Sequence, residues 1–168
     1  MYHALLPIDN DEDRVMAQAR AAADLSRAGE AVEVTFLHVF DDQERADDTS
    51  ATRLSAGNKA ADYLRDCGIT THSESRAGDP SEMIVRVADE INADSIILGG
   101  RKRSSLGALI FGSVSQTVML DAEYPVMITG DTVKADPDSI CRTCGEKYYT
   151  EAEITECRSC GGAKVERV

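Results

Sequence analysis

The sequence predicts an α/β fold: a doubly wound five-stranded parallel sheet with helices on both faces, followed by a small cysteine-rich unit. Two observations lead to this prediction. Through the first 130 residues strand-like and helix-like patterns alternate, and strands joined by helices form parallel sheets. After residue 139, four cysteines lie in a segment too short to build a sufficient core of its own. The predicted domains are therefore 1–130, a linker at 131–139 and a cysteine-rich unit at 140–168.

The first half of the chain alternates between strand and helix. Residues 3–8 form a short apolar run, which is typical of a buried strand. Apolar residues then recur at helical spacing through 11–29, and this segment ends at a glycine. Residues 31–40 are rich in β-branched and aromatic side chains and predict the second strand. The acidic stretch 41–50 predicts a solvated loop, and a second helix is expected at 51–67.

The second half continues the alternation. Three further strands are expected: 69–78 at an edge of the sheet, 95–99 in its interior, and 126–129. Asp79 is the predicted N-cap of a helix that ends near Asn92, because Pro80 fits the first turn. Ser113 is the predicted N-cap of a last helix through about residue 120, because Gln116 follows three residues later. In such sheets, ligands bind outside the carboxyl ends of the strands.

The composition excludes several classes of function. Asp and Glu total 30 against 18 Lys and Arg, so the formal net charge is −12. A field of this sign repels nucleic acid and anionic membranes. No apolar run is long enough to cross a bilayer, and the first residues lack the basic start of a signal peptide. We therefore expect a cytoplasmic protein, whose acidic, lysine-poor composition resembles that of proteins from salt-loving archaea.

The segment "GGRKRSSLGALIFGS" places a glycine-rich basic loop between the strand 95–99 and the last helix. The first turn of a helix has unpaired N–H groups and the positive end of the helix dipole, which together favour an anion such as phosphate. Glycines would let the backbone come close, and the basic side chains would add charge. The alternative is a loop that only turns the chain. The predicted anion-binding residues are Gly99, Arg101, Lys102, Gly112, Ser113, Val114 and Ser115.

Over roughly residues 1–130 the sequence resembles the universal stress protein family. The resemblance is carried by "LLPIDN", "FLHVF", "GDPSEMIVRVADEINADSIILGG" and the segment from the loop to "YPVMIT". Nucleotide-binding members have a G-x2-G-x9-G-[S/T] loop that wraps the ATP phosphates. Gly99, Gly112 and Ser113 match this pattern, whereas Lys102 replaces its second glycine. Lys102 would either grip the phosphate with its charge or keep it out.

The resemblance also implies a binding pocket and a function. It places Pro7, Asp9 and Val39 at the adenosine pocket, and it implies ATP or a related adenine nucleotide, with Mg²⁺, in a stress-response or regulatory module. Family members often form homodimers through the last strand, here 126–129. The alternative is a dimeric interaction module that has lost nucleotide binding. An enzyme that slowly hydrolyses ATP is a third reading, but no general base is evident, and we expect His38 to be structural.

The four cysteines of the tail predict a metal site. Cys141 and Cys144 form one Cys-x-x-Cys pair, Cys157 and Cys160 form a second, and a glycine follows each pair. Such pairs each aim two thiolates at one ion, which is typical of a structural Zn²⁺ ribbon. Two disulfides, redox-active thiols or a single iron are the alternatives. Residues 138–168 contain six acidic and five basic side chains, so the ribbon has little electrostatic reason to bind DNA and a protein partner is expected. Cys67 is expected to be a small buried residue.

Overall fold

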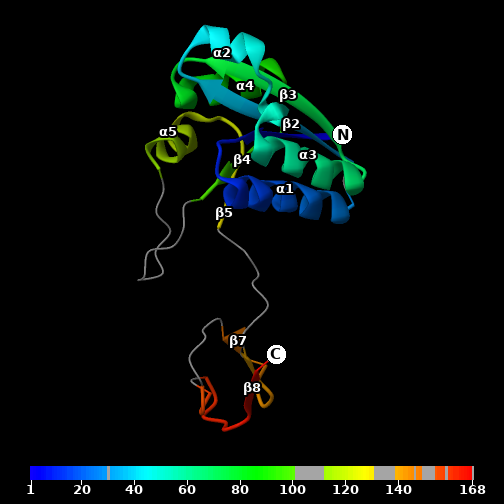
Figure 1. Cartoon of the computed structure of the whole chain (residues 1–168), viewed down its shortest axis with the longest axis vertical. Helices are drawn as coiled ribbons and strands as arrows, with labels where there is room; N and C mark the ends of the chain where they lie inside the picture. Colours follow the sequence, from blue (N-terminus) through cyan, green and yellow to red (C-terminus); the bar gives the residue numbers. More distant parts are fainter. Residues whose placement is uncertain are drawn as a thin grey trace. The chain divides into compact units, whose positions relative to one another are not determined.

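The chain forms two compact units, Met1–Asp131 and Thr132–Val168, each with a sheet of its own (Figure 1). The computed structural model describes residues 1–29, 31–100, 112–130, 139–145, 147–148, 154–157 and 159–167. Among these residues, no helix combines the length and the apolar character that crossing a membrane requires.

The described part of the first unit alternates strands and helices, as expected. In chain order the elements are β1 (Tyr2–Pro7), α1 (Glu12–Arg27), β2 (Val32–Phe40), α2 (Gln43–Asp48), the 3-10 helix η1 (Ala51–Arg53), α3 (Ser55–Asp66), β3 (Thr70–Ala77), α4 (Pro80–Glu90), β4 (Ser95–Gly99), α5 (Ser113–Asp121) and β5 (Val126–Thr129). The strands form one parallel sheet in the order β3-β2-β1-β4-β5. The predicted fold class is confirmed, and the chain changes direction across the sheet between β1 and β4.

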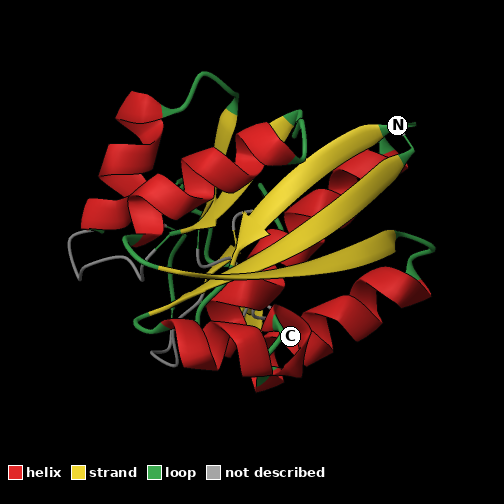
Figure 2. Cartoon of the chain, turned by 90° about the horizontal axis from the view of Figure 1, so that it is seen from above, coloured by secondary structure: helices red, strands yellow, loops and turns green. Residues whose placement is uncertain are grey.

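Helices cover both faces of this sheet (Figure 2). Successive residues of a strand point to opposite faces, so the central strand β1 contributes to two separate cores. Leu6 packs with residues of α1 and α3, whereas Leu5 packs with residues of α4 and α5, and both leucines are fully buried. Burial on both faces explains why β1 reads as a continuous apolar run in the sequence.

The helix ends confirm one sequence prediction and correct three others. Asp79 caps α4, since its carboxylate accepts hydrogen bonds from two backbone N–H groups of the first turn. The N-cap of α5 is Gly112, so the prediction that Ser113 is the cap was wrong. The stretch 41–50 contains α2 rather than only a loop, because Asp42 caps residues with high helix propensity. Cys67 is exposed at the end of α3, not buried.

The described part of the second unit is a small antiparallel sheet. Its strands are β6 (Ser139–Cys141), β7 (Lys147–Tyr148) and β8 (Val165–Arg167), in the order β7-β6-β8. Two turns close the cysteine pairs: Gly145 N–H donates to the Cys141 carbonyl, and Gly161 N–H donates to the Cys157 carbonyl, both at 2.8 Å. Both glycines have positive φ, 77° and 68°, which explains why glycine follows each pair.

Candidate functional site

A cavity of about 270 Å³ lies at the carboxyl ends of β1, β2 and β4 in the first unit. Its size is close to the lower end of the range for small-molecule sites. Eight of the residues predicted to bind a nucleotide line it: Pro7, Asp9, Val39, Gly99, Gly112, Ser113, Val114 and Ser115. Arg101 and Lys102 lie outside the described residues. The cavity has further lining residues that the sequence did not suggest as site residues: Ile8, Arg14, Gln18, Leu37, His38, Pro80, Ile84 and Leu98.

Gln18 supports the cavity at the point where β1 and β4 part. The pairing of these strands covers only two positions, and beyond Leu5 and Ile96 they no longer face each other in register. The Gln18 amide nitrogen donates to the carbonyl of Pro7 at 2.7 Å and to that of Ile97 at 2.8 Å. The side chain is buried, with 1% of its surface exposed. Both N–H groups of the amide are therefore used to bridge the two strand ends.

Three charged side chains form a network at the cavity. The Arg14 guanidinium donates to the Asp9 carboxylate in a short contact and to the Asp11 carboxylate at 2.8 Å. Asp11 is also the N-cap of α1, and its backbone N–H donates to Asp9 Oδ1 at 2.9 Å. One cation is thus shared by two carboxylates. Asp9 therefore has two contacts: a local turn contact with the Asp11 N–H and an ion pair with Arg14.

Gly99 is required by packing against Arg14. A Cβ atom at Gly99 would lie 2.1 Å from Arg14 Cγ and 2.6 Å from Arg14 Cδ, far inside any real contact. The sequence suggested that Gly99 keeps the backbone open to a phosphate. In the structure, the space beside Gly99 is filled by the aliphatic part of Arg14.

The N-terminus of α5 opens into the same cavity. The first helical hydrogen bond runs from Gln116 N–H to the Gly112 carbonyl at 3.0 Å. The backbone N–H groups of Ser113, Val114 and Ser115 precede it, and an α-helix provides no partner within itself for these positions. Because these three residues line the cavity, donors and the positive end of a helix dipole are present there.

His38 has a structural hydrogen bond, in line with its expected role. Its Nδ1 lies 2.8 Å from the Ile8 carbonyl, and its ring meets Phe40 edge-on at 4.5 Å between centroids. A carbonyl oxygen can only accept, so Nδ1 carries the proton in this contact. His38 thereby ties the end of β2 to the residue after β1.

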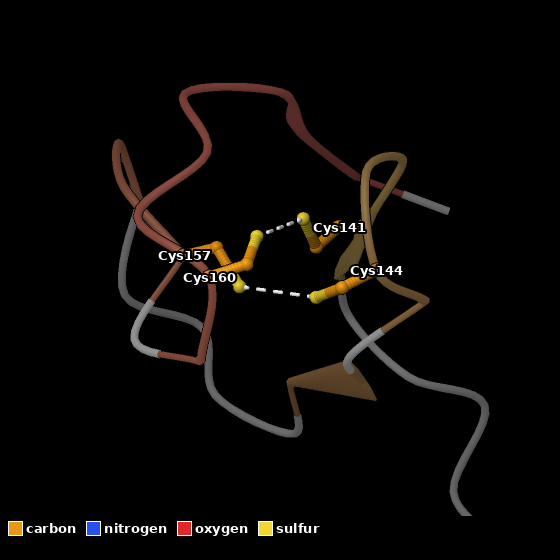
Figure 3. Close-up of side chains that lie close together, drawn as sticks. All are labelled: Cys141, Cys144, Cys157 and Cys160. Carbon is orange, nitrogen blue, oxygen red and sulfur yellow. Dashed lines mark hydrogen bonds between the residues drawn. The ribbon is translucent and has the colours of Figure 1, made fainter.

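The four predicted cysteine ligands come together in the second unit. Their Sγ atoms all lie within 4.8 Å of one another, with 3.8 Å between Cys141 and Cys160 and 3.5 Å between Cys144 and Cys157 (Figure 3). A disulfide would need about 2.05 Å, so the sulfurs are not bonded to each other. Four Zn–S bonds of about 2.3 Å in a tetrahedron place the sulfurs about 3.8 Å apart. The cluster could therefore hold a metal ion with little movement.

Hydrogen bonds favour the thiolate form of two of the four cysteines, Cys157 and Cys141. The Tyr148 hydroxyl donates a hydrogen bond to Cys157 Sγ at 3.0 Å. This hydrogen bond is the main reason why the pKa of Cys157 is lowered to about 6. The backbone N–H of Cys144 is the main cause that lowers the pKa of Cys141. The backbone N–H of Gly162 acts in the same direction on Cys160, but burial and the thiols of Cys157 and Cys141 outweigh it, so the pKa of Cys160 is raised. A thiolate is the form of cysteine that binds a metal, so these hydrogen bonds prepare Cys141 and Cys157 to bind a cation.

Comparisons with known proteins agree with this architecture. The model of the Universal stress protein family matches residues 1–130. A universal stress protein structure from Archaeoglobus fulgidus is 30% identical, covers 77% of this chain and 98% of its own, and has a TM-score of 0.63. Stress response protein NhaX of Bacillus subtilis is 45% identical over 51 residues, which are 30% of this chain and 31% of NhaX. The chain thus matches about a third of the length of that relative.

Other proteins with this fold have been solved with adenine nucleotides. A universal stress protein from Archaeoglobus fulgidus in complex with dAMP is 23% identical, with a TM-score of 0.58 over 77% of this chain and 98% of that chain. A family member from Arabidopsis thaliana with AMP bound is 16% identical, with a TM-score of 0.53 over 82% and 97%. At these identities the likeness establishes the fold, and the nucleotides are properties of those proteins. Together with the family match, the sheet order and the cysteine geometry lead to one assignment: this chain belongs to the universal stress protein family and has a C-terminal four-cysteine cluster consistent with a zinc-ribbon-like tail.

Proposed function

We propose that the first unit binds ATP or a related adenine nucleotide, with Mg²⁺, and acts as a stress-response or regulatory module. The observation that carries the proposal is the N-terminus of α5, which opens into the same cavity as the Asp9 carboxylate. The backbone N–H groups of α5 can only donate hydrogen bonds, and they favour an anion. A carboxylate can only accept hydrogen bonds, and it favours the hydroxyl or amino groups of a ligand. A phosphorylated ribose offers both kinds of group. Relatives solved with dAMP and AMP support the adenine base.

The basic loop adds to this proposal. Arg101 and Lys102 belong to the segment between β4 and α5. Residues of β4 and of α5 line the cavity. We propose that Lys102, in the position of the second glycine of the family pattern, contacts the phosphates with its charge. A glycine at this position lets the backbone come close to the phosphate. The Lys102 ammonium group would instead bind the phosphate through a charge-assisted hydrogen bond.

Thermal unfolding of the full chain with AMP, ADP and ATP, each with and without Mg²⁺, tests the nucleotide site. A ligand at 100 times its Kd should stabilise the fold by about 2.7 kcal/mol. Ser115→Asp should abolish this stabilisation, because it places an anion where the phosphate would bind, while it suits the helix dipole of α5. Thr117→Asp is the matched control, since Thr117 is an exposed residue of the same helix and does not line the cavity. An unfolding temperature that none of the nucleotides changes would contradict the proposal.

A second candidate is a dimeric interaction module that does not bind nucleotides. Two exposed apolar side chains of the first unit favour it: Leu120 on α5 is 85% exposed, and Met127 on the edge strand β5 is 36% exposed. Among the described residues β5 is at the edge of its sheet, and an edge strand with an exposed apolar residue is suited to pairing with a second chain. Light scattering of the full chain measures its oligomeric state. A dimer without any nucleotide effect would favour this candidate.

For the second unit we propose a structural Zn²⁺ held by Cys141, Cys144, Cys157 and Cys160. The ion would supply the folding free energy that so small a unit lacks. With four thiolate ligands its coordination would be complete, so no position would remain open for a substrate. The unit would then serve as a rigid surface for a protein partner. Elemental analysis of protein purified without added metal tests the identity of the ion, and an iron-loaded red protein would contradict zinc.

Tyr148→Phe is expected to weaken zinc binding about tenfold or more, within the 10–100-fold range typical of lost outer-shell hydrogen bonds. The reason is the loss of the hydroxyl that donates to Cys157 Sγ at 3.0 Å, while the buried ring is kept. Competition with a chromophoric chelator measures the affinity. Tyr63→Phe, in α3 of the first unit, is the matched control. Equal affinities of Tyr148→Phe and the parent would show that the hydroxyl does not act on the metal.

A further inference from the structure

Among the described residues, Arg14 offsets the negative charge of Asp9 and Asp11 at the cavity. Asp9 and Asp11 contribute two negative charges, and both carboxylates bind the guanidinium of Arg14. The group of three therefore has a net charge of about −1, whereas without Arg14 it would be about −2. Asp9 and Arg14 both line the cavity that the N-terminus of α5 also reaches.

Arg14 is held in this position from three directions. Its backbone N–H donates to Asp11 Oδ1 at 3.2 Å at the start of α1. Its aliphatic stem fills the space beside Gly99, where not even one methyl group could be added. Its guanidinium binds the two carboxylates, and only 25% of the side chain is exposed. The cation is thus fixed at the cavity rather than free to leave it, because the stem, the head group and the backbone are all in contact.

This position matters for an anionic ligand. A phosphate at the N-terminus of α5 would share the cavity with Asp9 and would be repelled by unpaired carboxylates. We propose that Arg14 is a specificity-determining residue: by offsetting Asp9 and Asp11, it lets the cavity accept a phosphorylated nucleoside in preference to the neutral nucleoside. It also holds Asp9 as a fixed acceptor for the hydroxyl groups of a sugar. The inference rests on the proposed nucleotide site and names what selects its ligand.

The affinities of the full chain for AMP and for adenosine test the inference when measured by calorimetry at low ionic strength. Arg14→Met keeps an unbranched stem beside Gly99 but removes the charge. It should lower the ratio of AMP to adenosine affinity about tenfold, the size expected of one partly exposed charge. Arg14→Lys keeps a positive charge and should retain most of the ratio.

Asp11→Asn provides a second test that does not depend on packing at Gly99. Asparagine is as good an N-cap as aspartate, so α1 should keep its start. The loss of one negative charge should raise the ratio of AMP to adenosine affinity severalfold. Thermal unfolding of each variant verifies that it is folded.

The outcomes separate this inference from the function on which it rests. A parent chain that binds neither AMP nor adenosine would overturn both. A parent that binds AMP, with an Arg14→Met variant that loses AMP and adenosine affinity equally, would overturn only the inference and make Arg14 a packing residue. A gain of AMP affinity in Arg14→Met would also overturn it, because Arg14 would then exclude the phosphate.

Discussion

Removal of the proposed metal ion from the four-cysteine cluster is expected to unfold the C-terminal unit, Thr132–Val168, while the five-stranded unit stays folded. The buried core that the structure describes in this unit consists of Cys141, Tyr148 and Cys157, and Ile154 and Val165 pack against it. Two of its three buried residues are thus proposed metal ligands. Structural zinc contributes about 10–16 kcal/mol to the folding of small domains at pH 7, so little would remain to stabilise the fold without it.

Hydrogen exchange followed by mass spectrometry, before and after chelation, measures this effect in each unit separately. The amides of β6 should lose their protection, and those of β1 and β4 should keep it. Cys157→Ser should reproduce the loss without chelator, because it removes a ligand. Cys67→Ser is the matched control, since Cys67 is exposed and belongs to the other unit. Protection of β6 that persists in metal-free protein would contradict a structural metal.

The cysteine cluster could be predicted because its geometry is local. Each Cys-x-x-Cys pair forms one tight turn, so two thiolates are placed by four residues and only the meeting of the two turns depends on the rest of the unit. The sheet could be predicted for a related reason: burial on both faces gives β1 and β4 continuous apolar runs, and helical periodicity separates them. The cavity then follows from the rule that parallel strands present their carboxyl ends on one side.

The missed features depend on contacts between distant residues or on competing local effects. The role of Arg14 arises from its packing on Gly99, 85 positions away in the chain, and spacing within α1 does not reveal it. The charge of residues 41–50 favoured a loop, but helix propensity and the Asp42 cap decided the outcome and formed α2.

Gln18 did leave a signal in the sequence: it is a polar residue among Val15, Ala19 and Ala22 on the buried side of α1. A lone amide on an apolar helix face indicates backbone groups that need a donor.

Those backbone groups are the carbonyls of Pro7 and Ile97. In a parallel sheet a strand carbonyl normally receives an N–H from its neighbour, but the pairing of β1 with β4 ends at Leu5 and Ile96. The two carbonyls lie where the strands separate to form the cavity. Gln18 supplies one hydrogen to each of them, at 2.7 Å and 2.8 Å. The amide thus substitutes for the hydrogen bonds that the opening of the sheet removes.

Gln18→Met is therefore expected to destabilise the first unit by about 3 kcal/mol. An unsatisfied buried polar group costs about 1–3 kcal/mol, two carbonyls are affected, and burial of the methionine offsets part of the loss. Hydrogen exchange of β1 and β4 in the full chain measures the change within this unit. Gln43→Met is the matched control, because Gln43 is exposed on α2 and its amide donates to the exposed Asp47 of the same helix. This substitution should change stability by less than about 0.5 kcal/mol. A loss of stability in Gln18→Met no larger than in this control would contradict the prediction. It would show that water can replace the hydrogen bonds of the amide, and that the separation of β1 from β4 does not depend on Gln18.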